Sequence, residues 1–133
     1  NQASCLCGKV RFQVAKFLPV VGHCHCTMCR KFHGAAFSTF AEVKLTDLHW
    51  VSGQDCLRHY QAENGTVRSF CQNCGSSLLF ESKYNRQNGT IEVATAVFDH
   101  IEAITPSAHI YTESKVNWYE INDGLPQYLS YRK

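Results

Sequence analysis

The chain has 133 residues, of which 44% are hydrophobic and 18% charged, so its composition excludes a disordered tail and a coiled coil. Thirteen Lys and Arg against eleven Asp and Glu give a net charge of only +2, which is small for a nucleic-acid-binding surface. No apolar run approaches the ~18 residues that span a bilayer. We therefore expect neither a nucleic-acid nor a membrane partner. The first residues show no leader pattern, so we expect a single cytoplasmic domain over residues 1–133.

Strand patterns outnumber helix patterns along the chain. Alternating apolar and polar residues over 9–14 predict a half-buried strand, and the Phe-, Thr- and Ala-rich stretch 35–43 predicts another. Between and after these strands, short helical turns are expected over 27–32 and 46–49.

Two Asn-Gly dipeptides predict hairpin turns. The pair at 64–65 would join strands over 56–62 and 66–70, and the pair at 88–89 would lead into a strand over 90–98. No linker or internal repeat divides the chain. We therefore predict one mainly β domain with antiparallel sheets and little helix.

Cysteine is the unusual residue, with eight in the chain. The eight occur as Cys5-x-Cys7, Cys24-x-Cys26-x-x-Cys29, a single Cys56, and Cys71-x-x-Cys74. An even number would also suit a disulfide framework. However, cysteines one or two residues apart are poor disulfide partners for each other and good ligands for one metal, and a cytosol keeps thiols reduced. The spacing therefore favours zinc sites.

The two short cysteine pairs each lack the ligands for a tetrahedral site. Cys5 and Cys7 are expected on the same side of an extended segment, and Cys71 and Cys74 around a tight turn for which Gly75 permits a positive φ. Together the pairs supply four thiolates, which predicts a closed structural zinc. Counting alone leaves open another partition, in which Cys71 or Cys74 completes the remaining cluster.

That remaining cluster is Cys24, Cys26 and Cys29, three ligands within six residues and with no obvious fourth. Three protein ligands with an exchangeable fourth position are typical of catalytic zinc. Because zinc deprotonates a coordinated thiol, an electron-rich three-thiolate site would leave a bound sulfur nucleophilic. The cluster therefore predicts a site that handles a thiol substrate.

Three segments of the chain together resemble one known family. They are Cys5-x-Cys7-Gly8-x-Val10-x-Phe12, Cys24-His25-Cys26-x-x-Cys29-Arg30-Lys31 and Phe70-Cys71-x-x-Cys74-Gly75-Ser76. The pattern is similar to the glutathione-dependent formaldehyde-activating (GFA) family, which includes centromere-protein-V-like proteins. Pro106-x-x-His109-Ile110 and the segment 118–126 also look like its C-terminal half.

The resemblance implies a β-tent zinc fold with two zinc ions per chain. A structural zinc would lie on Cys5, Cys7, Cys71 and Cys74, and a catalytic zinc on Cys24, Cys26 and Cys29. It further implies a carbon–sulfur lyase that joins glutathione and formaldehyde into S-(hydroxymethyl)glutathione, or releases the adduct in reverse. The glutathione sulfur would bind the catalytic zinc and attack the aldehyde carbon. Candidate substrate contacts are His25, Arg30, Lys31 and His109; the two cations could attract a carboxylate.

Two other interpretations stay open from the sequence. A non-catalytic zinc-scaffolded interaction module predicts that a protein ligand, such as a neighbouring histidine, closes the three-cysteine cluster. Methionine sulfoxide reduction on a similar zinc fold would need a reactive cysteine outside the metal sites, and only Cys56 is available. A free cysteine of this kind is commonly just a small buried hydrophobe.

Overall fold

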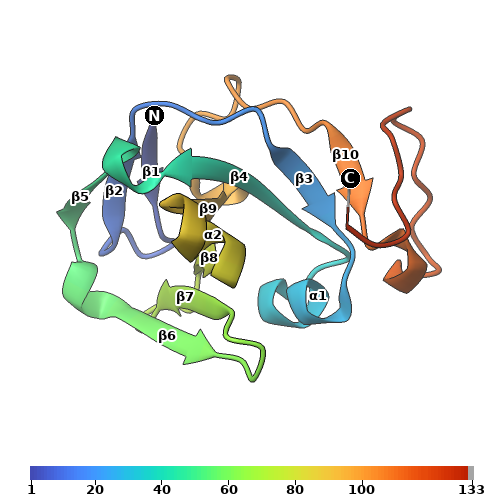
Figure 1. Cartoon of the computed structure of the whole chain (residues 1–133). Helices are drawn as coiled ribbons and strands as arrows, with labels where there is room; N and C mark the ends of the chain where they lie inside the picture. The colour runs from blue at the N-terminus through green and yellow to red at the C-terminus, as the bar shows by residue number, and fades with distance from the viewer. Residues whose placement is uncertain (132–133) are drawn as a thin grey trace.

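The computed structural model describes residues 1–131 as two sheets that meet at one hydrophobic core (Figure 1). The smaller sheet has the order β1-β2-β5, with β1 at Gln2–Ser4, β2 at Arg11–Val14 and β5 at Leu48–Ser52. The larger sheet has the order β10-β3-β4-β9-β8-β7-β6. Its strands are β10 at Ala108–Ile110, β3 at Val21–Cys24, β4 at Ser38–Lys44, β9 at Thr90–Ala94, β8 at Ser77–Glu81, β7 at Val67–Cys71 and β6 at Leu57–Gln61.

The strand pairing is antiparallel with one exception among the named strands of residues 1–131. β10 runs parallel to β3, with His109 opposite His23 and Ile110 opposite Cys24. Parallel neighbours need a long connection between them, and here most of the chain separates the two strands (Figure 1). The predicted mainly β fold is confirmed.

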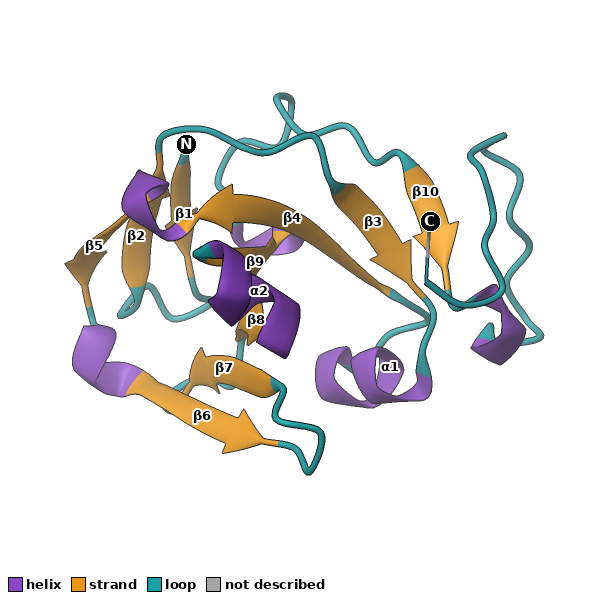
Figure 2. Ribbon diagram, viewed as in Figure 1, coloured by secondary structure: helices purple, strands orange, loops and turns teal. Residues whose placement is uncertain are grey.

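Helices contribute little and are short (Figure 2). The two α-helices are α1 at Thr27–His33 and α2 at Lys83–Asn88, and the 3-10 turns are η1 at Leu45–Asp47, η2 at Gln54–Cys56, η3 at Thr95–Val97 and η4 at Thr112–Ser114. No helix within residues 1–131 has the length and apolar character needed to cross a membrane.

The two Asn-Gly pairs have different roles. At 64–65 the predicted hairpin is confirmed, because this turn joins β6 to β7. At 88–89 the hairpin prediction is wrong. Asn88 ends α2, and Gly89 is its C-cap with φ 64°. The same left-handed backbone that favours Asn-Gly in hairpins also favours glycine after a helix. A capping box on Ser82 starts that helix.

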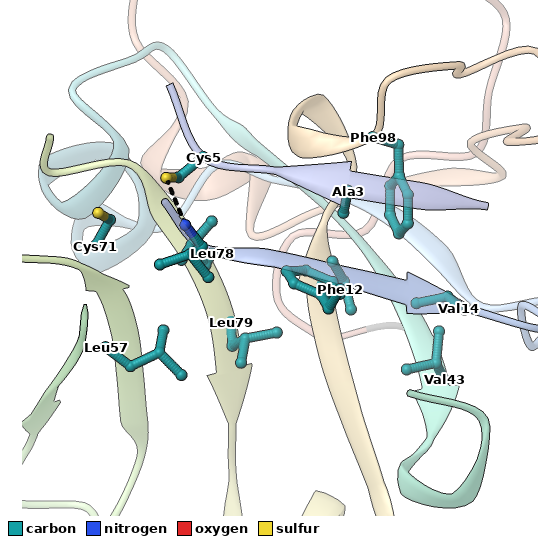
Figure 3. Close-up of a cluster of buried hydrophobic side chains, with 12 residues drawn as sticks. Ala3, Cys5, Phe12, Val14, Val43, Leu57, Cys71, Leu78, Leu79 and Phe98 are labelled. Carbon is teal, nitrogen blue, oxygen red and sulfur yellow. Dashed lines mark hydrogen bonds between the residues drawn. The ribbon is translucent and has the colours of Figure 1, made fainter. Parts of the chain in front are cut away.

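The main core lies between the sheets and is built mostly from strand residues that face inward. Phe12 is central to it, with its ring edge-on to Trp50 at a centroid distance of 5.3 Å and to Phe98 at 6.4 Å. Cys5 and Cys71 belong to the same buried cluster (Figure 3). A metal centre at these cysteines would therefore be continuous with the core.

Gly53, which directly follows β5, packs closely against the backbone of Lys9, which precedes β2. Gly53 has φ +75°, and a Cβ atom there would lie 2.0 Å from the carbonyl oxygen of Lys9. We predict that Gly53→Ala lowers the free energy of unfolding by roughly 3 kcal/mol, since backbone must shift as well as adopt a strained φ. The matched control is Gly34→Ala, which has φ +61° and no atom within 4 Å of the new Cβ; it should cost only about 1 kcal/mol. Guanidinium denaturation of the zinc-loaded protein, followed by Trp fluorescence, measures both, and equal losses would contradict the clash.

Candidate metal centres

The four-cysteine cluster joins the N-terminus of the chain to the end of β7. The sulfur atoms of Cys5, Cys7, Cys71 and Cys74 all lie within 4.8 Å of one another. The Sγ atoms of Cys5 and Cys7 are 3.5 Å apart, and those of Cys7 and Cys71 are 3.9 Å apart. Four sulfurs bound tetrahedrally to zinc would be separated by about 3.8 Å, given Zn–S bonds of ~2.3 Å. The donor set therefore fits a tetrahedral zinc ion.

Backbone turns present these four sulfurs. Cys5 and Cys7 were expected on an extended segment, but they lie on a turn, closed by the N–H of Gly8 donating to the carbonyl of Cys5 at 3.0 Å. The turn prediction for the second pair is confirmed, because Gly75 has φ +80° and its N–H donates to the carbonyl of Cys71 at 2.8 Å. The N–H of Val10 also donates to Sγ of Cys5 at 3.3 Å. Backbone hydrogen bonds therefore define the shape of both knuckles.

The three-cysteine cluster lies where β3 passes into α1. Cys24 ends the strand, Cys26 is the N-cap of the helix, and Cys29 lies in its first turn. All three are more than nine-tenths buried, and their sulfurs lie within 4.8 Å of one another. The sulfur of Cys26 accepts the N–H of Cys29 at 3.2 Å, which is the bond that a capping oxygen usually makes. Hydrogen bonds from the thiols of Cys24 and Cys29 hold the pKa of Cys26 well below its usual range.

Arg68 on β7 is a functional candidate that sequence analysis missed. It is 5% exposed, and its Nη1 and Nη2 atoms each lie 3.6 Å from Sγ of Cys29. The guanidinium also lies over the rings of Phe32 and Phe80, at 5.6 and 5.0 Å from their centroids. A buried cation needs a partner, and the guanidinium finds its acceptor in the sulfur of Cys29. In the sequence Arg68 is only one polar position of a strand, and nothing local indicates which cluster that strand covers.

A cavity of about 530 Å³ opens beside the three-cysteine cluster. Its walls come from α1, β4, β7, β8, β9 and the segments around residues 62–66, 82–84 and 110–111. The residues on which the later argument depends are Cys24, Cys26, Cys29, Arg68, Tyr84 and Tyr111. The cluster is therefore buried in the protein and yet borders a space large enough for a small molecule.

Tyr111 forms part of this wall in a strained conformation. It has φ 56°, and among residues 1–131 no other residue besides glycine has a positive φ. Its N–H donates to the carbonyl of Ser130 at 2.9 Å, which holds the backbone in place. Such strain persists only where the surroundings impose it, and it concentrates at functional sites. Burial, with the nearby charges of Cys24 and Cys26, raises the pKa of the Tyr111 hydroxyl, so this group stays protonated at neutral pH.

Two of the predicted substrate contacts form a buried chain of hydrogen bonds. Nε2 of His25 lies 2.8 Å from Nδ1 of His109, and Nε2 of His109 lies 2.7 Å from Oδ2 of Asp123. Both histidines are fully buried. Burial, together with the charge of His109, lowers the pKa of His25 to about 4, so its ring is neutral at neutral pH. These hydrogen bonds anchor the loop between Cys24 and Cys26 to the C-terminal segment.

None of the four predicted substrate contacts is among the residues of 1–131 that line the cavity. His25 and His109 lie in the hydrogen-bonded chain, whereas Arg30 and Lys31 lie on α1, where Lys31 is exposed. Contact of these residues with a substrate stays a prediction. Cys56 lies in η2, is partly buried, and packs against the main core.

Comparison with known proteins places these clusters in a family. The sequence profile described as glutathione-dependent formaldehyde-activating enzyme matches residues 1–114, which include all seven clustered cysteines. The chain belongs to the GFA family. The membership expected from the cysteine motifs is thus confirmed.

Relatives of this GFA-family chain cover most of its length. A putative glutathione-dependent formaldehyde-activating enzyme of Halomonas elongata is 30% identical over 127 residues, covering 90% of this chain and 80% of that protein. An uncharacterized lyase of Schizosaccharomyces pombe is 27% identical over 119 residues, covering 90% and 83%. A Rhodobacter sphaeroides protein of known crystal structure shares the fold, with a TM-score of 0.65 at 21% identity, covering 96% of this chain and 99% of that one.

The four-cysteine cluster makes a direct prediction about metal content and stability. Cys71→Ser should lower the metal bound per chain by about one ion and lower the melting temperature, because structural zinc contributes folding free energy outright. Cys56→Ser is the matched control, since Cys56 belongs to neither cluster. Elemental analysis of protein purified without chelator, with a thermal melt of each variant, makes the test. Equal metal contents in the two variants would show that Cys71 is not a ligand.

Proposed function

We propose that this GFA-family chain, as one zinc-binding domain over residues 1–133, is a zinc-dependent carbon–sulfur lyase. It would join glutathione and formaldehyde into S-(hydroxymethyl)glutathione and cleave the adduct in reverse. The observation that carries the proposal is a buried three-cysteine cluster whose sulfurs border a cavity of about 530 Å³. The names of the Halomonas and Schizosaccharomyces relatives support this class of reaction.

The two clusters receive different roles in this proposal. Cys24, Cys26 and Cys29 would hold the catalytic zinc, and the four-cysteine cluster would hold the structural zinc. When bound by three thiolates, zinc supplies a fourth position at which a thiol is held as a nucleophilic thiolate. The protein contributes the shape of the site, because the N-cap bond of Cys26 and the burial of all three sulfurs fix the donors in place.

Arg68 limits the negative charge that gathers at this centre. Three thiolates and a fourth from the substrate would leave an excess of negative charge in a buried site. The two guanidinium nitrogens at 3.6 Å from Cys29 would offset part of it, and the guanidinium carbon lies over the rings of Phe32 and Phe80. Arg68 is therefore assigned as a positioning residue that acts through Cys29.

Tyr111 is assigned to the aldehyde oxygen. As the sulfur of the thiol attacks the aldehyde carbon, a carbon–sulfur bond forms and the carbonyl electron pair moves onto oxygen, which then takes a proton. Tyr111 lines the cavity, and the raised pKa of its hydroxyl keeps a proton available for a hydrogen bond to that oxygen. In giving that proton to the oxygen Tyr111 becomes a phenolate, and in the reverse reaction this phenolate takes the proton back.

The alternative of a non-catalytic interaction module requires a fourth protein ligand at the three-cysteine cluster. Within residues 1–131, no His, Cys or carboxylate ligand atom joins the three sulfurs in a group of 4.8 Å spacing. This favours an exchangeable fourth position. A reductase centred on Cys56 is also disfavoured, since Cys56 packs on the main core and the described residues that line the cavity do not include it.

Exchange NMR on glutathione and formaldehyde tests the activity. The adduct forms spontaneously, so the quantity to measure is the exchange rate with and without the zinc-loaded protein. We expect acceleration that Cys26→Ser abolishes and that Cys56→Ser retains. Loss of acceleration in the zinc-loaded wild type would refute the substrate assignment, and retention in Cys26→Ser would refute the site.

The role of Arg68 is tested by a conservative change. We predict that Arg68→Lys lowers kcat/KM by roughly 10-fold, because an ammonium presents no planar pair of donors to Cys29 and stacks poorly between two rings. Arg58→Lys is the matched control, since Arg58 lies on the exposed face of β6 and donates only to backbone carbonyls. Zinc content should stay the same in both. Unchanged kinetics in Arg68→Lys would remove Arg68 from the proposed mechanism.

A further inference from the structure

We propose that His23, His109 and Asp123 form a third metal site, which takes a divalent first-row transition metal. One ring nitrogen of each histidine and a carboxylate oxygen of Asp123 all lie within 4.8 Å of one another. These three residues belong to neither cysteine cluster and are not among the described residues that line the cavity. The proposed metal site therefore shares no residue with the cysteine clusters or with the cavity lining, and the proposal does not rest on the proposed function.

The fold brings the three side chains together from three distant segments. His23 on β3 lies directly opposite His109 on β10, and because residues opposite each other on paired strands point to the same face, the two rings are neighbours. Their centroids are 4.7 Å apart with the ring planes tilted by 35°. Asp123 is held beside them by the C-terminal segment, whose Pro126 carbonyl accepts the N–H of His109 at 2.9 Å.

Each of the three side chains is also fixed by a hydrogen bond from its other polar atom. Nδ1 of His23 lies 2.7 Å from Oγ1 of Thr39, and Nδ1 of His109 lies 2.8 Å from Nε2 of His25. Oδ1 of Asp123 accepts the N–H of Leu125 at 3.1 Å. Outer hydrogen bonds of this kind select the tautomer and orientation of metal-ligating histidines. They assign Nε2 of both histidines and Oδ2 of Asp123 as the ligating atoms.

The donor set and its spacing select the class of metal. Two imidazoles and one carboxylate with open positions suit a divalent transition metal such as iron, cobalt or nickel. Nε2 of His109 and Oδ2 of Asp123 are 2.7 Å apart. With ligand bonds of about 2.1 Å, that separation subtends an angle of roughly 80° at the metal, which is nearer to octahedral than to tetrahedral coordination. The side chain of Asp123 is 39% exposed, so water reaches the remaining positions.

A metal at this site would link β3, β10 and the C-terminal segment. β10 ends at Ile110 and Tyr111 follows it directly, and both residues line the cavity. The alternative use of the same residues is a plain hydrogen-bonded chain, with a proton between His109 and Asp123. A metal ion and this proton would compete for the same place between Nε2 of His109 and Oδ2 of Asp123. A measurement of metal binding therefore distinguishes the metal site from the hydrogen-bonded arrangement.

Cobalt titration makes the test. The full chain, produced without a polyhistidine tag and loaded with two equivalents of zinc, is titrated with Co²⁺ while visible absorption and zinc release are followed. We expect one further equivalent of Co²⁺ to bind with weak bands typical of nitrogen and oxygen ligands, without a thiolate charge-transfer band and without loss of zinc.

Variants locate the binding. Asp123→Asn keeps the shape of the side chain and an oxygen for the N–H of Leu125, and His23→Gln keeps a polar group beside Thr39; each should weaken Co²⁺ binding by roughly 10-fold or more. Asp99→Asn is the control, because this carboxylate outside the site accepts a hydrogen bond from Ser4 and should leave binding unchanged. Circular dichroism and retention of two zinc ions verify folding. The proposal is overturned by the absence of a third equivalent, by zinc release on cobalt binding, or by undiminished binding in both site variants.

Discussion

Cys7 and Cys71 are 64 residues apart in the sequence, and their sulfurs lie 3.9 Å apart beside the main hydrophobic core. This contact decides where β7 lies, because Cys71 is the last residue of that strand. Arg68 is three residues earlier on the same strand and reaches Cys29 in the other cluster. A metal that fixes the end of β7 therefore also fixes the guanidinium at the second centre. The two clusters, although separate as ligand sets, are mechanically connected through one strand.

The second cluster depends on a balance of burial and charge. Its three sulfurs are buried, which would be unfavourable for thiolates, and Arg68 and the N–H of Cys29 offset that cost. Tyr84 and Tyr111 line the cavity that these sulfurs border. Behind the cluster, His25 and His109 secure the loop to the rest of the chain. Within residues 24–29, the cysteines thus border the cavity, whereas His25 is hydrogen-bonded to His109.

Cysteine spacing predicted the two groups of cysteines that the fold brings together, because tetrahedral coordination restricts which short pairs can combine. Alternating residues likewise predicted β2, since burial on one face leaves a period of two. The contact of Arg68 with Cys29 could not be predicted, because it depends on which cluster β7 packs against, and the two residues are far apart in the sequence. The hydrogen bonds from His25 through His109 to Asp123 could not be predicted either, because they depend on the parallel pairing of β3 and β10, which are far apart in the sequence. The hairpin predicted at Asn88-Gly89 was wrong for a local reason, because a helix C-terminus and a hairpin turn both favour glycine in the left-handed conformation.

The position of β10 at the edge of the large sheet bears on intermolecular strand pairing. β10 is a three-residue strand at the end of the large sheet, and such an edge is a template for pairing with another chain. Its outer side is covered by residues 126–128, since the N–H and carbonyl of His109 bond to Pro126 and Tyr128. The family profile ends at residue 114, before this cover. A chain shortened before residue 126 would leave the N–H and carbonyl of His109 without these partners, at an edge open to intermolecular strand addition.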